Sequence, residues 1–180
     1  MKRFLPIFFL LTLTVFLYGC PYDSPYNIDE APLQYIDESL LGNWATFVKK
    51  SDDDRHSKEE PVKVIFEKRT AMDYDIAITG YINELKPYHV VENDSIKGSA
   101  YLSVVGNKQF LNAYIHGKVY IAEIIKDGSK LSILPLSEYF TSKLIKNSKE
   151  LRIAVEYHCK VKITPAHDPF FSLKNLQKVK

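Results

Sequence analysis

Apolar and polar residues alternate along much of the chain between Leu40 and Leu134. Successive side chains of a strand point to opposite faces, so this period of two predicts strands with one buried face. Runs at 109–115, 119–126 and 131–134 continue the series. Many short, closely spaced strands predict an antiparallel up-and-down barrel in a mainly β protein. The clearest apolar sets are Val62, Val64 and Phe66; Tyr74, Ile76 and Ile78; and Ala100, Leu102 and Val104.

Dipeptides that contain glycine separate the later strands. They are Gly106-Asn107, His116-Gly117 and Asp127-Gly128. Asp-Gly between two apolar runs is a strong signal for a two-residue hairpin loop, so we expect consecutive hairpins here. Asp52-Asp53-Asp54 lacks the glycine and the alternating ligands of a calcium loop, and is expected to be a solvated turn between the first two strands.

The pattern changes after Pro135. Residues 136–145 show no strand alternation and contain good helix formers. Asn147 precedes Glu150 by three residues, which resembles a capping box. We therefore predict two short C-terminal helices, the second burying Leu151, Ala154 and Val155 on one face. The tail, 165–180, is expected to pack back on the barrel through Phe170, Phe171, Leu173 and Leu176.

The first twenty residues have the composition of an export signal. Lys2 and Arg3 precede an apolar stretch at 4–16, which closes with Leu17-Tyr18-Gly19-Cys20. A membrane span needs about 20 apolar residues, and this stretch is shorter and interrupted. We therefore expect a signal peptide at 1–19, a tether at 20–39 and one barrel domain with a helical C-terminal segment at 40–180.

Charge supports this division. The formal charge of the chain is +2, and removal of Lys2 and Arg3 lowers it to 0. Because the basic balance belongs to the signal, no nucleic-acid partner is expected. Residues 21–39 carry Asp23, Asp29, Glu30, Asp37 and Glu38 but no Lys or Arg, which favours a polar tether.

Leu17, Gly19 and Cys20 resemble the cleavage motif of bacterial lipoprotein signals. The resemblance implies cleavage between Gly19 and Cys20, lipid attachment at Cys20, and a membrane partner reached through that lipid. Because Pro21 rather than aspartate follows the cysteine, the same resemblance implies a place in the cell envelope at the outer membrane.

Gly42-Asn43-Trp44 resembles the entry strand of lipocalin-like barrels. There the tryptophan packs across the barrel floor, so the resemblance implies structural roles for Gly42 and Trp44. The combination of lipoprotein signal and entry strand is similar to small, uncharacterised lipoproteins of the Bacteroidetes type, as are the segments 109–112 and 149–152. This family implies a fold and an envelope address, but no established activity.

Few residues have the spacing of a catalytic or metal site. None of His56, His89, His116, His158 and His167 forms a zinc-like pair. The chain has no nucleophile elbow, phosphate-binding glycine loop or dinucleotide motif. Cys159 is the one cysteine left beside Cys20, and is either a buried filler or a reactive thiol. We therefore predict no enzyme activity, no cofactor and no metal.

Tyrosines are the more suggestive side chains. They are either core packing or the lining of a barrel mouth that holds an apolar or planar ligand. The leading prediction is a lipid-anchored envelope lipoprotein that binds a small apolar molecule or lipid. The alternative is a protein-interaction or inhibitor module of an envelope complex. The tyrosines on or beside predicted strands are Tyr74, Tyr81, Tyr88, Tyr101, Tyr114 and Tyr120.

Overall fold

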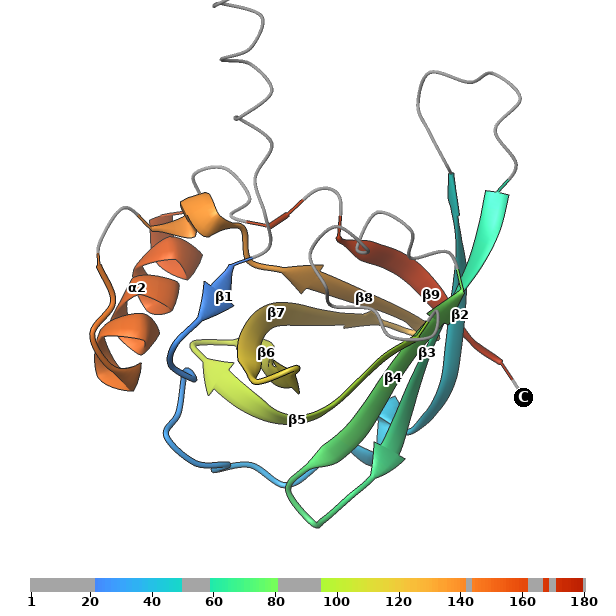
Figure 1. Cartoon of the computed structure of the whole chain (residues 1–180), viewed down its shortest axis with the longest axis horizontal. Coiled ribbons are helices and arrows are strands. Elements are labelled where there is room, and N and C mark those ends of the chain that lie inside the picture. Colours follow the sequence, from blue (N-terminus) through green and yellow to red (C-terminus); the bar gives the residue numbers. More distant parts are fainter. Residues whose placement is uncertain are drawn as a thin grey trace, which may run out of the picture.

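Eight antiparallel strands close into a barrel in the computed structural model (Figure 1). A short first strand lies outside the barrel, and one α-helix packs on the barrel wall. The described residues are 22–49, 59–80, 95–141, 144–161, 167–168 and 171–179. The elements are β1 (Asp23–Ser24), η1 (Glu38–Leu40), β2 (Gly42–Lys49), β3 (Glu59–Lys68), β4 (Tyr74–Gly80), β5 (Ser95–Val105), β6 (Lys108–Ile115), β7 (Lys118–Asp127), β8 (Lys130–Pro135), η3 (Glu138–Phe140), α2 (Ser148–Val161) and β9 (Leu173–Val179).

Strand order confirms the predicted up-and-down barrel. Strands β2 to β8 pair in sequence order, and β9 closes the ring between β8 and β2. The tail that the sequence predicts to pack on the barrel therefore supplies one of its strands, β9, in which Leu176 is fully buried. Strand β7 pairs with β8 along its second half and with β1 at Val119 and Tyr120.

Two of the three predicted glycine dipeptides form hairpin loops at the expected positions. Gly106-Asn107 joins β5 to β6, and His116-Gly117 joins β6 to β7. His116 and Gly117 have φ of 50° and 75°, the left-handed pair that suits the strand twist. The third loop is Gly128-Ser129, one residue later than expected, because Asp127 is the last residue of β7 and pairs with Lys130.

The helix predicted over 136–145 is wrong. Its described part holds a single 3₁₀ turn, Glu138–Phe140, and no α-helix. Ser137 makes no side-chain capping bond there, and Thr141 returns to extended backbone. Phe140 and Ile145 are buried separately against the neighbouring layer, so tertiary packing decides the path of this segment.

The second predicted helix is confirmed as α2. The Asn147 side-chain oxygen accepts the Glu150 N–H at 2.9 Å, and the Glu150 carboxylate accepts the Lys146 N–H at 2.9 Å. The Asn147 half is the cap expected from the sequence, but the Glu150 carboxylate accepts the N–H of Lys146, the residue before Asn147, instead of the Asn147 N–H. Within the described ranges, no helix has the length and apolar character needed to cross a bilayer.

The barrel interior holds one apolar cluster, which we call the interior cluster. Alternate residues of the strands supply it, as the period of two predicts. Its largest fully buried side chains are Trp44, Phe66 and Tyr74, and η1 adds Leu40 from one end. The other buried members are Val64, Ile76, Ile96, Ala100, Leu102, Leu111, Ala113, Ile115, Ala122, Ile124, Leu131, Ile133 and Leu176.

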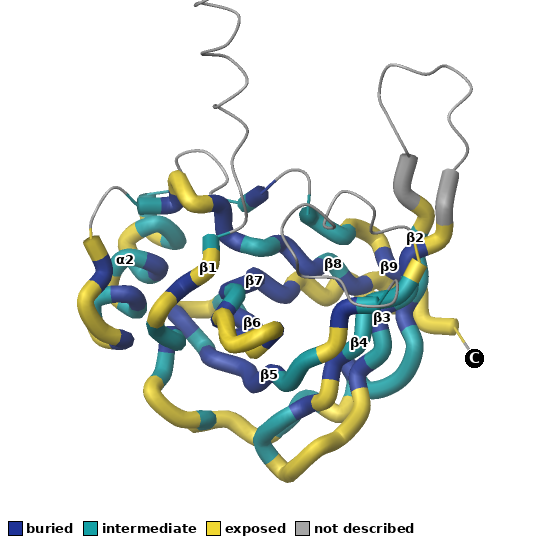
Figure 2. The backbone as a smooth tube through the Cα atoms, in the orientation of Figure 1, coloured by how far each residue is buried: buried dark blue, intermediate teal, exposed yellow. Residues whose placement is uncertain are grey.

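A second apolar cluster lies on the outer wall of β5, β6 and β7, and we call it the outer cluster. Helix α2 and the N-terminal segment cover it, so these strands are buried on both faces (Figure 2). The second face explains why Tyr101, Ser103 and Val105 are buried beside Ala100 and Leu102. The buried members are Ile28, Val105, Phe110, Val119, Ile121, Leu136, Phe140, Ile145, Leu151 and Val155.

The described part of the predicted tether, residues 22–39, is packed rather than free. Ile28 is 1% exposed in the outer cluster, β1 pairs with β7, and η1 lies next to the interior cluster. The tether prediction counted charges and missed that Tyr22, Tyr26 and Ile28 contact the covered wall. The barrel domain therefore begins well before residue 40.

Candidate functional site

The sequence-predicted site residues fall into two groups. Gly19 and Cys20 lie outside the described residues. Gly42 opens β2 with φ of 111°, a conformation that disfavours any other residue. Trp44 is 2% exposed, and its indole N–H donates to the Leu40 carbonyl at 2.7 Å. The Lys178 ammonium lies 5.5 Å from the centre of the Trp44 ring, a cation–π distance.

The tyrosines do not form a single barrel mouth. Tyr74 is buried in the interior cluster, and burial raises its pKa to about 12. Tyr120 packs beside that cluster, whereas Tyr101 and Tyr114 lie on the outer wall. Tyr81 and Tyr88 lie outside the described residues. Successive side chains of a strand point to opposite faces of the sheet. The described tyrosines are therefore divided between the interior and the outer wall of the barrel.

The largest aromatic side chains of the barrel interior are closely packed by their neighbours. Trp44, Phe66 and Tyr74 are 2%, 1% and 0% exposed, which leaves no room for a void the size of a water molecule against them. Phe66 and Tyr74 meet edge to face with ring centres 5.7 Å apart. Small barrels either fill with side chains or hold a ligand, and these residues take the first option.

An open recess lies on the outer wall of the barrel, between the N-terminal segment and strands β5 and β6. Its volume is about 280 Å³, close to the lower end of small-molecule sites. The β3–β4 hairpin supplies one side through Asp73. Its lining residues are Glu30, Ala31, Pro32, Asp73, Ser99, Ala100, Tyr101 and Tyr114.

Hydrogen bonds from the barrel hold the N-terminal segment across this wall. The buried Asn112 side chain accepts the Ile28 N–H at 2.8 Å and donates to Ser103 Oγ at 2.8 Å. The Tyr101 hydroxyl donates to the Asp29 carbonyl. Because these polar groups are buried and paired, the segment is fixed and the recess is preformed.

Arg152 of α2 fixes the same segment from the other side. Its guanidinium lies 2.5 Å from the Asp29 carboxylate and donates to the Val104 carbonyl at 2.7 Å. The Asp29 side chain is only 9% exposed, so this pair is shielded from solvent more than a surface ion pair. Helix α2, β5 and the N-terminal segment are therefore tied at one point.

Two tyrosine rings and two carboxylates give the recess its chemical character. The Tyr101 and Tyr114 rings lie 6.2 Å apart at 35°. Burial, then the neighbouring Tyr114, raises the pKa of Tyr101, so its hydroxyl stays protonated. Glu30 is exposed at the rim, and Asp73 accepts a hydrogen bond from Thr70 at 2.9 Å. The lining combines aromatic faces with negative charge.

A buried carboxylate that the sequence analysis did not single out lies elsewhere on the outer wall. Glu123 of β7 is 4% exposed. It lies 2.8 Å from the Lys108 ammonium and 2.8 Å from His167 Nε2. Its signal in the sequence is a lone acid within the apolar run 119–125. His167 and Asp168 follow α2, and the Asp168 N–H donates to the Pro135 carbonyl at 2.7 Å.

The pKa values around Glu123 describe an ion-paired structural site. Burial alone would raise the pKa of Glu123, but hydrogen bonds from His167 and Lys108 outweigh it and lower the pKa. Burial lowers the pKa of His158 and raises the pKa of the Cys159 thiol. Cys159 is partly buried beside the outer cluster, and its raised pKa disfavours the reactive thiolate.

The described residues include no group of three or more His, Cys, Asp and Glu side chains arranged to hold a metal ion. His116 lies in the β6–β7 turn, far along the chain from His158 and His167, and His56 and His89 lie outside the described residues. No protein-family model matches this chain, and no curated protein or solved structure matches it.

Proposed function

We propose that this protein is a lipid-anchored, non-enzymatic binding protein of the bacterial cell envelope, and that the outer-wall recess holds a small organic cation. The anchor proposal rests on Leu17, Gly19 and Cys20. Replacing Cys20 with Ser should leave the chain without acyl chains and release it from membranes. Normal acylation or membrane retention of that variant would contradict the anchor.

The single observation that carries the ligand proposal is the preformed recess. Sites for quaternary ammonium groups combine aromatic faces with negative charge. Tyr114, which is 37% exposed, supplies the accessible ring beside the nearly buried Tyr101, and Glu30 and Asp73 supply the charge. Asn112 holds the N-terminal segment that forms one side of the recess. This segment needs little further ordering when a ligand binds, so the entropic cost of binding is small.

The packed interior cluster supports this choice over an apolar ligand among those side chains. Trp44, Phe66 and Tyr74 occupy that part of the barrel themselves. The outer recess contains Ala31, Pro32 and the tyrosine rings beside its carboxylates. A ligand with a compact apolar body and a positive group matches both kinds of surface.

The test compares choline with its uncharged tert-butyl analogue, dimethylbutanol, by calorimetric titration of the full chain. Choline should bind more tightly. Glu30→Gln and Tyr114→Leu should each weaken it by about 0.5–1 kcal/mol, or roughly two- to fivefold in Kd. Glu38→Gln is the matched control, because Glu38 is exposed and lies outside the recess. Equal binding of the two compounds, or equal loss in all three variants, would exclude the cation site.

A further inference from the structure

The chain between the proposed lipid and the folded domain is very short. Tyr22, two residues after Cys20, is already packed: its N–H donates to the Leu136 carbonyl at 2.9 Å. Its ring meets Phe140 edge to face with ring centres 4.7 Å apart. Two extended residues span at most about 7 Å. An acylated Cys20 would therefore hold the surface around Tyr22 next to the lipid headgroups.

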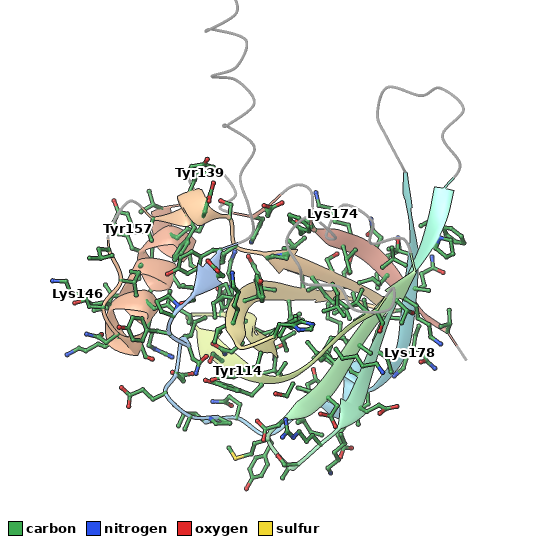
Figure 3. All side chains as sticks on the ribbon, viewed as in Figure 1. Tyr114, Tyr139, Lys146, Tyr157, Lys174 and Lys178 are labelled. Atoms are coloured by element: carbon green, nitrogen blue, oxygen red, sulfur yellow. The ribbon has the colours of Figure 1, made fainter. Side chains whose placement is uncertain are left out.

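Exposed apolar side chains gather on the elements beside Tyr22. We define the α2 face as Tyr139, Leu144, Ile153 and Tyr157, which are 62%, 80%, 54% and 68% exposed. Tyr139 belongs to η3, the 3₁₀ turn that contains the Phe140 partner of Tyr22. Figure 3 places Tyr139 and Tyr157 in the upper left of the view.

The residues around this face suit a lipid surface. Ile153 and Tyr157 are four apart on α2, so they lie one above the other on its outer side. Lys146 and Lys149 are exposed on the same stretch of chain. Tyrosine favours the boundary between headgroups and acyl chains, and lysines are attracted to anionic headgroups. Single exposed apolar residues are ordinary on soluble proteins, but here four come from η3, α2 and the segment that joins them, and η3 contains the Phe140 partner of Tyr22.

We propose that the α2 face lies against the bilayer that holds the Cys20 lipid, so that the domain is seated on the membrane rather than suspended above it. The inference rests on the proposed lipidation of Cys20. The β3–β4 hairpin, which supplies Asp73 to the recess, lies at the bottom of Figure 1, away from β1 and α2, and would then point away from the membrane. The recess consequently opens to the aqueous side.

The test uses the full acylated chain in vesicles of phosphatidylethanolamine and phosphatidylglycerol. A Cys159→Ser background leaves one labelling site, Tyr157→Cys, for an environment-sensitive nitrobenzoxadiazole fluorophore. Ala71→Cys in the same background is the matched control, because Ala71 is exposed in the β3–β4 hairpin. The label at position 157 should shift to shorter emission wavelength and be quenched by spin-labelled lipid, whereas the label at position 71 should not.

Each other outcome has a definite meaning. Equal emission and quenching at positions 157 and 71, in a chain that floats with the vesicles and carries acyl chains by mass spectrometry, would overturn the seating and leave the anchor intact. Absence of acyl chains on Cys20 would instead contradict the proposed anchor. A shift at position 157 that needs added envelope proteins would overturn the membrane contact and indicate a protein partner. Ile153→Glu should abolish the quenching without releasing the acylated chain.

Discussion

The two sides of the barrel wall differ in how they become buried. Almost all residues of the interior cluster come from strands that are consecutive in the sequence and pair with one another. Neighbouring hairpins therefore bury most of this cluster. The outer cluster needs α2 and a segment from the other end of the chain to cover β5, β6 and β7. Ile28 and Asn112, which meet there, are 84 residues apart. A local pattern predicts the first kind of burial, whereas the second depends on distant segments meeting.

The largest expected effect is in the interior. Trp44→Ala removes a fully buried ring and its hydrogen bond to Leu40, so unfolding free energy should fall by about 3–5 kcal/mol. Urea denaturation followed by circular dichroism measures this loss. An unchanged midpoint would show that the ring does not support the barrel floor.

A comparable deletion tests whether the outer cluster is part of the same folding unit. Leu151 of α2 is fully buried there, so Leu151→Ala should cost about 2–4 kcal/mol in the same urea experiment. Ile153→Ala, at an exposed position of the same helix, is the control and should change stability by less than about 0.5 kcal/mol. If both variants lost the same small amount of unfolding free energy, α2 would not be part of the cooperative folding unit of the barrel.

A polar substitution tests the contact between the N-terminal segment and β6. Asn112→Ala leaves the buried Ile28 N–H without its acceptor and should cost about 1–3 kcal/mol. Faster hydrogen exchange at Ile28, together with weaker choline binding, would link this side chain to the shape of the recess. Unaltered exchange at Ile28 would mean that other contacts hold the segment. Gln177→Ala on β9 is an exposed control.

The smallest expected effect is at Glu123 and depends on pH. Glu123→Gln keeps the shape but removes the charge, so the loss at neutral pH should be about 1 kcal/mol. The pKa of Glu123 is lowered in the folded protein, so its stabilising effect is complete above its ordinary value of 4.5. That effect disappears as pH falls through the lower folded-state pKa.

Thermal unfolding of the parent chain and of Glu123→Gln between pH 7 and pH 3 isolates the contribution of the Glu123 charge. The parent chain should lose more stability on acidification than Glu123→Gln, and the two curves should converge at the acid end. His158 also has a lowered pKa, so both chains should lose some stability as pH falls below its ordinary value of 6.5. Parallel curves throughout would show that the Glu123 charge contributes nothing.

Local patterning in the chain was enough to predict several parts of the fold. Alternation predicted the buried faces of Val64 and Phe66 in the interior cluster and the burial of Val62, and Asn147 with Glu150 marked the start of α2. Glycine dipeptides located two hairpin loops because left-handed backbone conformations favour particular residues. Trp44, in the motif that resembles a lipocalin entry strand, is 2% exposed on β2.

Only the tertiary structure decided what covers the second face of β5 to β7. Charge counting predicted a tether at residues 20–39, but Ile28 is buried and Tyr22 is partly buried, because α2 and the outer wall provide the surface against which they pack. The recess and the ion-paired Glu123 arise in the same way, from side chains distant in sequence. Local periodicity reports which residues prefer burial; the position of the covering layer depends on long-range contacts that it does not encode.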